Sequence, residues 1–102
     1  MRGTKVTFDA DKLNYASELM RALAHPLRLK ILEFIDDNES INVNRIYSNL
    51  DIEQSITSQH LKILRLSGAV SVEVTGKYHI YKINYDVIEK ASFAVDRFVG
   101  KA

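Results

Sequence analysis

The sequence contains no cysteine, which excludes disulfide bonds, thiolate metal sites and thiol redox switches. Its N-terminal stretch also lacks an apolar run long enough for a signal peptide or a membrane span, so we expect a cytoplasmic protein. No repeat, low-complexity segment or long linker divides the chain. Its 102 residues, 46% of them hydrophobic, are enough for one core. Residues 1–102 are therefore predicted to form a single domain.

Neither sign of charge dominates, because the formal net charge is only +1. The charges are unevenly distributed, however. Between Gln54 and Asn84 the basic residues are Lys62, Arg65, Lys77 and Lys82, and Glu73 is the only acidic one. A locally basic segment in a nearly neutral chain is a modest indication of a polyanionic partner.

Helical spacing of apolar residues accounts for the first half of the chain. A first helix is expected from Asp9, and a second from Pro26, which suits the first position of a helix. The polar stretch 36–40 is expected to form a loop. Asn42 is a suitable N-cap for a short third helix that ends near Leu50. In the second helix we expect Leu27, Ile31, Phe34 and Ile35 to be buried, with Arg28, Lys30 and Glu33 pointing outward.

The stretch Gln54–Gly68 is predicted to form a helix with two different faces. Stepping 100° per residue places Ile56, His60, Ile63 and Leu64 on an apolar side, with Thr57 and Leu61 at its edge. The opposite side holds amides, hydroxyls and cations but no carboxylate, a set that suits base edges and phosphate oxygens. An ordinary amphipathic surface helix is the alternative. The polar side consists of Gln54, Ser55, Ser58, Gln59, Lys62 and Arg65.

Two strands and a last helix are predicted after Gly68. Val70, Val72 and Val74 alternate with polar residues, Thr75-Gly76 indicates a turn, and residues 78–83 suit a returning strand. The preceding short helix, tight turn and polar helix match a helix-turn-helix, so the hairpin would be its wing. The fold class is therefore mainly α (α+β), a winged helix-turn-helix of about five helices with a two-stranded hairpin.

The helix expected from Tyr85 or Asp86 to Val99 is apolar around most of its circumference. Such a helix must be buried on more than one side, and in a small chain a second copy is the natural partner. The first helix also has more apolar residues than one face requires. We therefore predict a homodimer, with a monomer as the alternative. Its interface is predicted to contain Leu13, Tyr15, Leu19, Met20, Val87, Ile88, Ala91, Val95 and Phe98.

Three linked stretches resemble a known family. Residues 22–32, ALAHPLRLKIL, resemble the second helix of ArsR-type (ArsR/SmtB) winged-helix repressors, and residues 54–64, QSITSQHLKIL, resemble their recognition helix. Residues 66–70 and 76–83 resemble their wing. The resemblance implies a homodimer, paired through its first and last helices, that represses an operator with two half-sites until an effector releases it. The resemblance implies that the residues facing DNA would be Ser55, Thr57, Ser58, Gln59, Lys62 and Arg65, with Lys77 at the wing tip. Gln54, on the same polar side of the helix, is also predicted to face DNA.

The familiar sensing chemistries of that family are not supported by these residues. The third helix has no cysteine box, and the last helix offers Asp86, Glu89 and Asp96 but no histidine. We therefore predict no metal site and no cofactor, and the effector is unknown. A capping or structural role is expected for His25, packing with a backbone hydrogen bond for His60, and exposure for His79 on the wing. Tyr47, Tyr78 and Tyr81 are expected to be packing residues.

Two other classes of function compete with a DNA-binding repressor. One is a winged-helix protein-interaction module without specific DNA binding. The carboxylate-free side of the fourth helix and Lys77 at the wing argue against this class. The other is an enzyme, but the sequence has no glycine-rich phosphate loop, nucleophile elbow, metal-ligand set or convincing carboxylate pair. We therefore expect no enzymatic activity.

Overall fold

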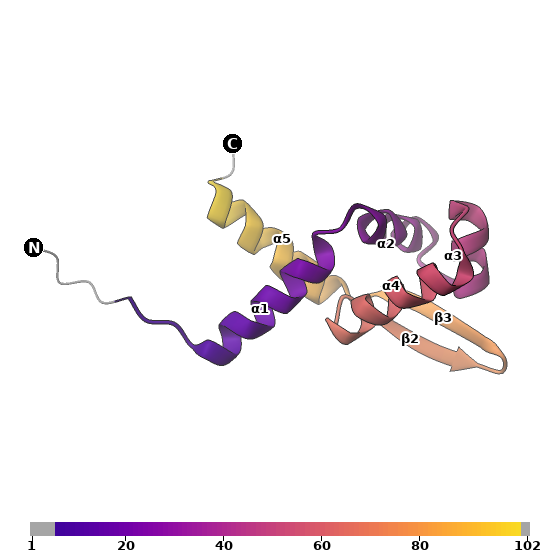
Figure 1. Cartoon of the computed structure of the whole chain (residues 1–102), viewed down its shortest axis with the longest axis horizontal. Helices are drawn as coiled ribbons and strands as arrows, with labels where there is room; N and C mark the ends of the chain where they lie inside the picture. Colours follow the sequence, from indigo (N-terminus) through magenta and orange to yellow (C-terminus); the bar gives the residue numbers. More distant parts are fainter. Residues whose placement is uncertain (1–5, 101–102) are drawn as a thin grey trace, which may run out of the picture.

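The computed structural model describes residues 6–100. In that range five helices and a small sheet follow one another along the chain (Figure 1). The elements, in order, are α1 (Ala10–Leu23), α2 (Pro26–Asn38), β1 (Ser40–Asn42), α3 (Val43–Leu50), α4 (Gln54–Leu66), β2 (Val70–Thr75), β3 (Tyr78–Ile83) and α5 (Tyr85–Val99).

The helix boundaries lie where local chemistry predicts them. The Asp9 carboxylate caps α1 by accepting from the amides of Asp11 at 3.0 Å and Lys12 at 3.2 Å. Pro26 occupies the first turn of α2, and the Asn42 side chain caps α3. After α4, Gly68 has a φ of +87°, a left-handed conformation that glycine adopts without the steric cost of a Cβ. These four predicted boundaries are confirmed.

The sheet has one strand more than predicted. It is antiparallel in the order β1-β3-β2, and β1 pairs Ser40 with Lys82 and Asn42 with Ile80. The prediction of a two-stranded hairpin was therefore incomplete. The predicted loop 36–40 was also wrong, because residues 36–38 form the end of α2 and residue 40 begins β1. Three residues are too short for a period-two pattern to be visible. Only Ile41, which is buried between polar neighbours, hinted at a strand.

The core lies between α2, α3, α4 and the sheet. Its most deeply buried apolar side chains are Ile31 and Ile35 of α2, Ile46 of α3, and Leu61 and Leu64 of α4, all with no exposed surface. Ala69, Val70 and Ile83 extend this core along the sheet. Helix α4 is thus held in place by the most deeply buried part of the molecule.

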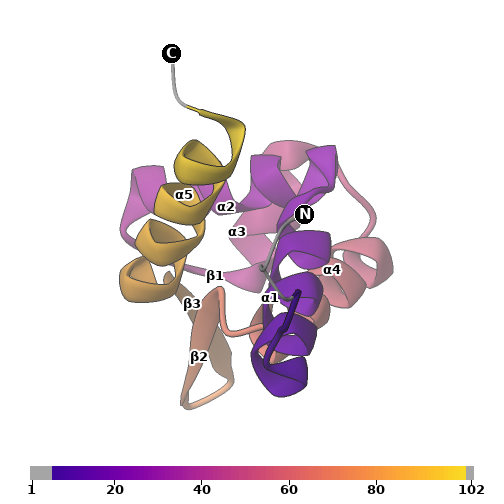
Figure 2. The same cartoon turned by 90° about the vertical axis from the view of Figure 1, so that its left-hand side faces the viewer.

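The two terminal helices project from this core. In Figure 1, α1 and α5 extend to the left of the remaining elements, and Figure 2 shows them in front of the core. The radius of gyration is 16.4 Å, whereas a compact domain of this length has about 13 Å. In α1 only Leu19 and Ala22 are buried, and in α5 only Ala91. Among residues 6–100, no helix is long and apolar enough to cross a membrane.

Candidate nucleic-acid interface

The polar side of α4 is open to solvent along its whole length. Six of the residues predicted to face DNA are exposed, and none of them forms a salt bridge with another described residue. Because this surface offers amides, hydroxyls and two cations without a carboxylate, it presents no negative charge of its own to a polyanion. The six residues, referred to below as the recognition surface, are Gln54, Ser55, Ser58, Gln59, Lys62 and Arg65.

Thr57 does not belong to this surface, and its prediction as a DNA contact was wrong. Its side chain is fully buried, and its hydroxyl donates to the carbonyl oxygen of Glu53 at 3.0 Å. Thr57, Leu61 and Leu64 occur at helical spacing and form the centre of the buried stripe of α4. Our helical wheel was rotated toward Ile56 and Ile63, whose side chains are still 38% and 39% exposed.

A tight turn sets the position of α4 relative to α3. Asp51 ends α3 in a left-handed conformation with φ +55°, and the Ile52 amide donates to the Tyr47 carbonyl at 3.1 Å. An aspartate tolerates this conformation better than most residues. Residues 51–53 therefore form the short connection expected in a helix-turn-helix, and the two helices pack together as its halves.

The wing ends in a two-residue loop formed by Gly76 and Lys77. Thr75 pairs with Tyr78, and Gly76 has φ +61° while Lys77 does not have a positive φ. A glycine with positive φ at the first loop position is typical of a type II′ hairpin turn. The Lys77 ammonium is exposed and lies 5.7 Å from the centre of the Tyr78 ring. Tyr78, predicted to be a packing residue, is 46% exposed, so that prediction was wrong.

The three histidines have different environments. His79 is exposed on β3, as predicted. The His25 Nδ1 accepts from the Leu27 amide at 3.1 Å and thereby caps α2, which confirms a capping role. His60 is half-buried, but its Nδ1 accepts from the Arg28 side chain at 3.2 Å, so our expectation of a backbone partner was wrong. The expectation that Arg28 points outward was also wrong, because its side chain is half-buried between α1 and α4.

Sequence periodicity did not identify the role of Arg28. It indicates only the side of α2 on which a residue lies, not the groups that its side chain contacts. Its Nη1 donates to the carbonyl oxygens of Arg21 at 3.2 Å and Ala22 at 2.9 Å, in the last turn of α1. The last four carbonyls of a helix lack partners within the helix. Arg28 therefore supplies donors to the end of α1 while its Nε reaches His60. The available signal was a cation close in sequence to a helix end.

The predicted dimer residues divide into three groups, which are buried, half-buried and exposed. Leu19 and Ala91 are buried in the core of their own chain, so their assignment to an interface was wrong. Met20, Val87 and Ile88 are half-buried. The apolar side chains left in solvent, referred to below as the terminal apolar surface, are Leu13, Tyr15, Val95 and Phe98 from the prediction, with Phe93 and Val99 in addition.

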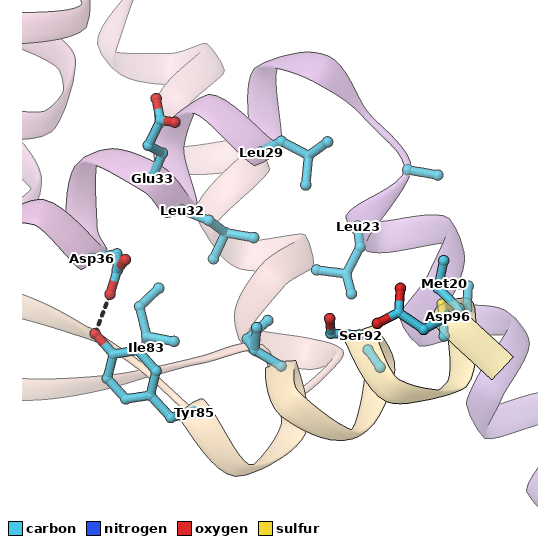
Figure 3. A pocket seen from close by; sticks show the side chains of 14 residues that line it. Met20, Leu23, Leu29, Leu32, Glu33, Asp36, Ile83, Tyr85, Ser92 and Asp96 are labelled. Carbon is cyan, nitrogen blue, oxygen red and sulfur yellow. Dashed lines mark hydrogen bonds between the residues drawn. The ribbon is translucent and has the colours of Figure 1, made fainter. Parts of the chain in front are cut away.

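A cavity of about 600 Å³ lies beside this surface, between the end of α1, α2 and α5 (Figure 3). Its walls are mostly apolar, and its polar groups are Glu33, Asp36, Tyr85, Ser92 and Asp96, with no basic residue. At one end the Tyr85 hydroxyl donates to the Asp36 carboxylate, and this hydrogen bond raises the pKa of Tyr85. Ser92 and Asp96 lie at the other end (Figure 3).

Metal ligands are not gathered anywhere in the part of the chain that the structure describes. No group of three or more histidine, aspartate or glutamate side chains within residues 6–100 is placed to hold a metal ion. The clustered pair His25 and His60 is instead engaged in hydrogen bonds to Leu27 and Arg28.

Comparisons with known proteins agree with this geometry. Residues 25–72 match the model of the arsR family of bacterial regulatory proteins. The transcriptional repressor SmtB of Mycobacterium tuberculosis is 37% identical over 71 residues, which cover 70% of this chain but only 52% of that protein. The chain thus matches about half of that relative's length.

Two further relatives match over nearly their whole length. An HTH-type transcriptional regulator of Methanocaldococcus jannaschii is 33% identical over 86 residues, covering 84% of this chain and 97% of the relative. The crystal structure of the transcriptional repressor PagR of Bacillus anthracis superposes with a TM-score of 0.70 at 32% identity. That match covers 80% of this chain and 93% of the PagR chain.

Proposed function

The chain belongs to the ArsR family of bacterial regulatory proteins, and we propose that it is a sequence-specific, DNA-binding transcriptional regulator that acts as a dimeric repressor. The observation that carries this proposal is the recognition surface on α4. It is polar, free of carboxylates and exposed, and the opposite side of α4 is anchored in the core by Thr57, Leu61 and Leu64. Repression is the favoured direction because SmtB and PagR are both named repressors.

Each part of this interface has a distinct task. The amides of Gln54 and Gln59 and the guanidinium of Arg65 are the groups suited to base edges in the major groove. The hydroxyls of Ser55 and Ser58 and the ammonium of Lys62 suit phosphate oxygens, which fix the register of the protein on the duplex. Lys77 at the wing tip would contact the backbone or minor groove beside the site. The DNA target is in the cytoplasm, and we place the protein there.

A second copy completes the reading of an operator. The terminal apolar surface leaves the Phe98 side chain 92% exposed, with Phe93 and Val99 at more than half. Contiguous exposed apolar side chains of this size mark an interaction site. A dimer formed through α1 and α5 would present two α4 helices to half-sites about 34–36 Å apart. The effector that would release the dimer is unknown, and no cofactor is proposed.

The competing proposal is an interaction module that has lost DNA binding. A partner protein would be expected to contact α4 through apolar or aromatic groups, since these are enriched at the centres of protein interfaces. The recognition surface has none. The family itself consists of bacterial regulatory proteins rather than enzymes.

Fluorescence anisotropy with fragments of the flanking genomic DNA tests the proposal. The protein is titrated into each fragment and into scrambled DNA at two salt concentrations. Selective binding to one fragment that persists at the higher salt would support it. Equal, weak binding to every fragment that disappears with salt would contradict it, because counterion release alone gives that behaviour.

A triple variant, Ser58→Ala, Gln59→Ala and Arg65→Ala, locates the interface. We expect it to lose selective binding while remaining folded and dimeric, because all three side chains are exposed. Lys30→Ala is the control, because Lys30 is an exposed cation on α2 and does not belong to the recognition surface. If the triple variant bound the selected fragment as well as the Lys30 variant, α4 would not be the reading element.

A further inference from the structure

Three side chains from separate elements meet where α4 packs against the start of α2. His25 lies in the turn between α1 and α2, Arg28 is in α2, and His60 is in α4. The two imidazole rings have centroids 4.8 Å apart, with their planes inclined at 56°. Between them, Arg28 bridges the end of α1 and the middle of α4. We call this group the histidine–arginine cluster.

The hydrogen bonds of the cluster require both imidazoles to be neutral. Arg28 remains charged and its guanidinium can only donate, so the His60 Nδ1 that receives its Nε–H must carry a lone pair. In the same way, the His25 Nδ1 must be unprotonated to accept from the Leu27 amide. A proton on either ring turns the acceptor into a donor and removes the bond.

The charged surroundings of His60 also disfavour its protonation. Partial burial, His25 and the Arg28 cation, in that order, lower the pKa of His60 below its usual value of 6.5. Glu18 and Arg21 of α1 line the adjoining groove with Arg28, and Lys62 is the nearest charged residue on α4 itself. A proton on His60 would therefore add a second positive charge beside Arg28. The attractive hydrogen bond between the two side chains would be lost, and they would repel each other.

We propose that Arg28 and His60 are positioning residues for DNA binding, which hold α4 in its reading orientation only while the His60 imidazole is uncharged. The inference rests on the proposed function, since it assigns to α4 the task of reading DNA. Acidification protonates His60, breaks the bridge from α2 to α4, and lowers the affinity for the operator. Neither residue belongs to the recognition surface, so both act on DNA through α4.

Ordinary electrostatics predicts the opposite response to pH. Protonating a histidine near DNA adds a positive charge, and added positive charge strengthens binding to phosphates. His79, exposed on the wing, would act in that direction. The sign of the pH dependence therefore separates a positioning role from a simple charge effect, provided that His79 is first replaced.

The test measures operator affinity by anisotropy at constant ionic strength from about pH 7.5 to about pH 5, in a His79→Gln background. With His60 intact, the Kd should rise as the pH falls below the His60 pKa, by up to about tenfold per pH unit for a single proton. His60→Asn keeps an acceptor close to the position of Nδ1 but cannot titrate, so its Kd should stay tight and change little. His60→Ala removes the acceptor and should bind weakly at every pH.

Two results of the pH titration, and one at neutral pH, would overturn the inference. One is an affinity that rises on acidification with His60 intact. The other is the same pH profile in the His60→Asn variant, because the titrating group would then lie elsewhere. An Ala variant as tight as the Asn variant at neutral pH would equally show that the bridge does not position α4.

A second readout keeps the inference separate from the proposed function. If the protein selects no fragment at neutral pH, the proposed function fails, but amide hydrogen exchange still reports on α4. Exchange rates are first corrected for the intrinsic effect of pH on amide exchange. At acid pH the inference then predicts faster exchange in α4 of the protein with His60 intact than in α4 of His60→Asn. Equal exchange in both proteins would refute the cluster as a positioning device, whether or not DNA is bound.

Discussion

Helices α4 and α5 are similar in length, 13 and 15 residues, yet they are held in opposite ways. Three side chains of α4 are buried at helical spacing, Thr57, Leu61 and Leu64, and its outward side is polar. In α5 only Ala91 is buried, while Phe93, Phe98 and Val99 remain in solvent. The buried stripe of α4 is formed within a single chain, whereas most apolar side chains of α5 remain exposed.

The difference shows what each exposed surface requires. The amides, hydroxyls and cations of α4 form hydrogen bonds with water, so this surface is stable in solvent until a polyanion binds. Exposed aromatic and aliphatic side chains on α5 gain free energy only by leaving water, at about 25 cal/mol per Å². We therefore assign DNA to the first surface and a second copy of the chain to the other. The predictions that follow test whether the two tasks are separable.

The largest effect is expected from the anchor of α4. Leu61→Ala should lower the free energy of unfolding by about 2–5 kcal/mol, because the side chain is fully buried and its removal leaves a cavity. Urea denaturation followed by circular dichroism measures the change. Ile63→Ala, on the same helix but 39% exposed, is the matched comparison and should cost clearly less. Equal losses would mean that the buried stripe of α4 is misassigned.

Substitutions in the terminal apolar surface should weaken the association of two chains rather than the folding of one chain. Phe98→Lys should weaken the dimer by about 2 kcal/mol or more, as expected for a buried aromatic anchor of an interface. The lysine suits the end of a helix, so α5 should persist. Sedimentation velocity measures the dimer dissociation constant, with Glu73→Lys, at an exposed acidic residue of β2 outside the terminal helices, as the control. A Phe98→Lys protein that stays dimeric would move the interface elsewhere.

Arg65 tests the recognition surface singly. Arg65→Ala should cost about 1–3 kcal/mol in operator binding if the guanidinium reads a base, and should relax the preference at one position of each half-site. Anisotropy against single-base variants of the operator gives both numbers. A uniform loss across all those variants would instead make Arg65 a phosphate contact.

The pH dependence of stability tests His60 without DNA. Its pKa in the folded chain is below the usual 6.5, so the unfolded chain takes up the proton first. The free energy of unfolding should therefore be unaffected above about pH 6.5, decrease as the pH falls toward the folded pKa, and level off below it. Comparing His60→Asn with the wild type by urea denaturation isolates this contribution. Parallel pH profiles would contradict it.

The smallest effect is expected at the wing tip. Lys77→Ala should weaken binding to selected and scrambled DNA alike and reduce the slope of log affinity against log salt by about 1, as loss of one phosphate contact does. Titrations at several salt concentrations measure that slope. A loss confined to the selected fragment would indicate that Lys77 reads the groove rather than the backbone.

Local signals explain how much of the fold could be predicted from sequence. Asp9, Pro26, Asn42 and Gly68 act on their immediate neighbours, so these four helix ends could be placed from the sequence, whereas the end of α2 at Asn38 could not. β1 could not, because its pairing with β3 joins segments about forty residues apart. A helical wheel gave the exposed side of α4 correctly for six residues but put Thr57 at the edge of the apolar side, although its side chain lies in the buried stripe.

The histidine–arginine cluster was beyond such reasoning for the same physical cause. The bond between Arg28 and His60 joins residues 32 positions apart, and both side chains can reach in more than one direction from their helices. Periodicity placed His60 on the packed side but could not name its partner. Periodicity likewise marked the terminal apolar surface. It could not show that Leu19 and Ala91 are buried in the core of their own chain.

The mass of the complex between the wild-type protein and its selected operator fragment tests the central claim most directly. Sedimentation velocity at saturating protein counts the chains on each duplex. The predicted result is two chains per fragment that bind together. Phe98→Lys should reduce this paired binding, although it leaves the recognition surface unchanged. One chain per fragment, bound with undiminished affinity, would contradict the division of tasks between α4 and α5.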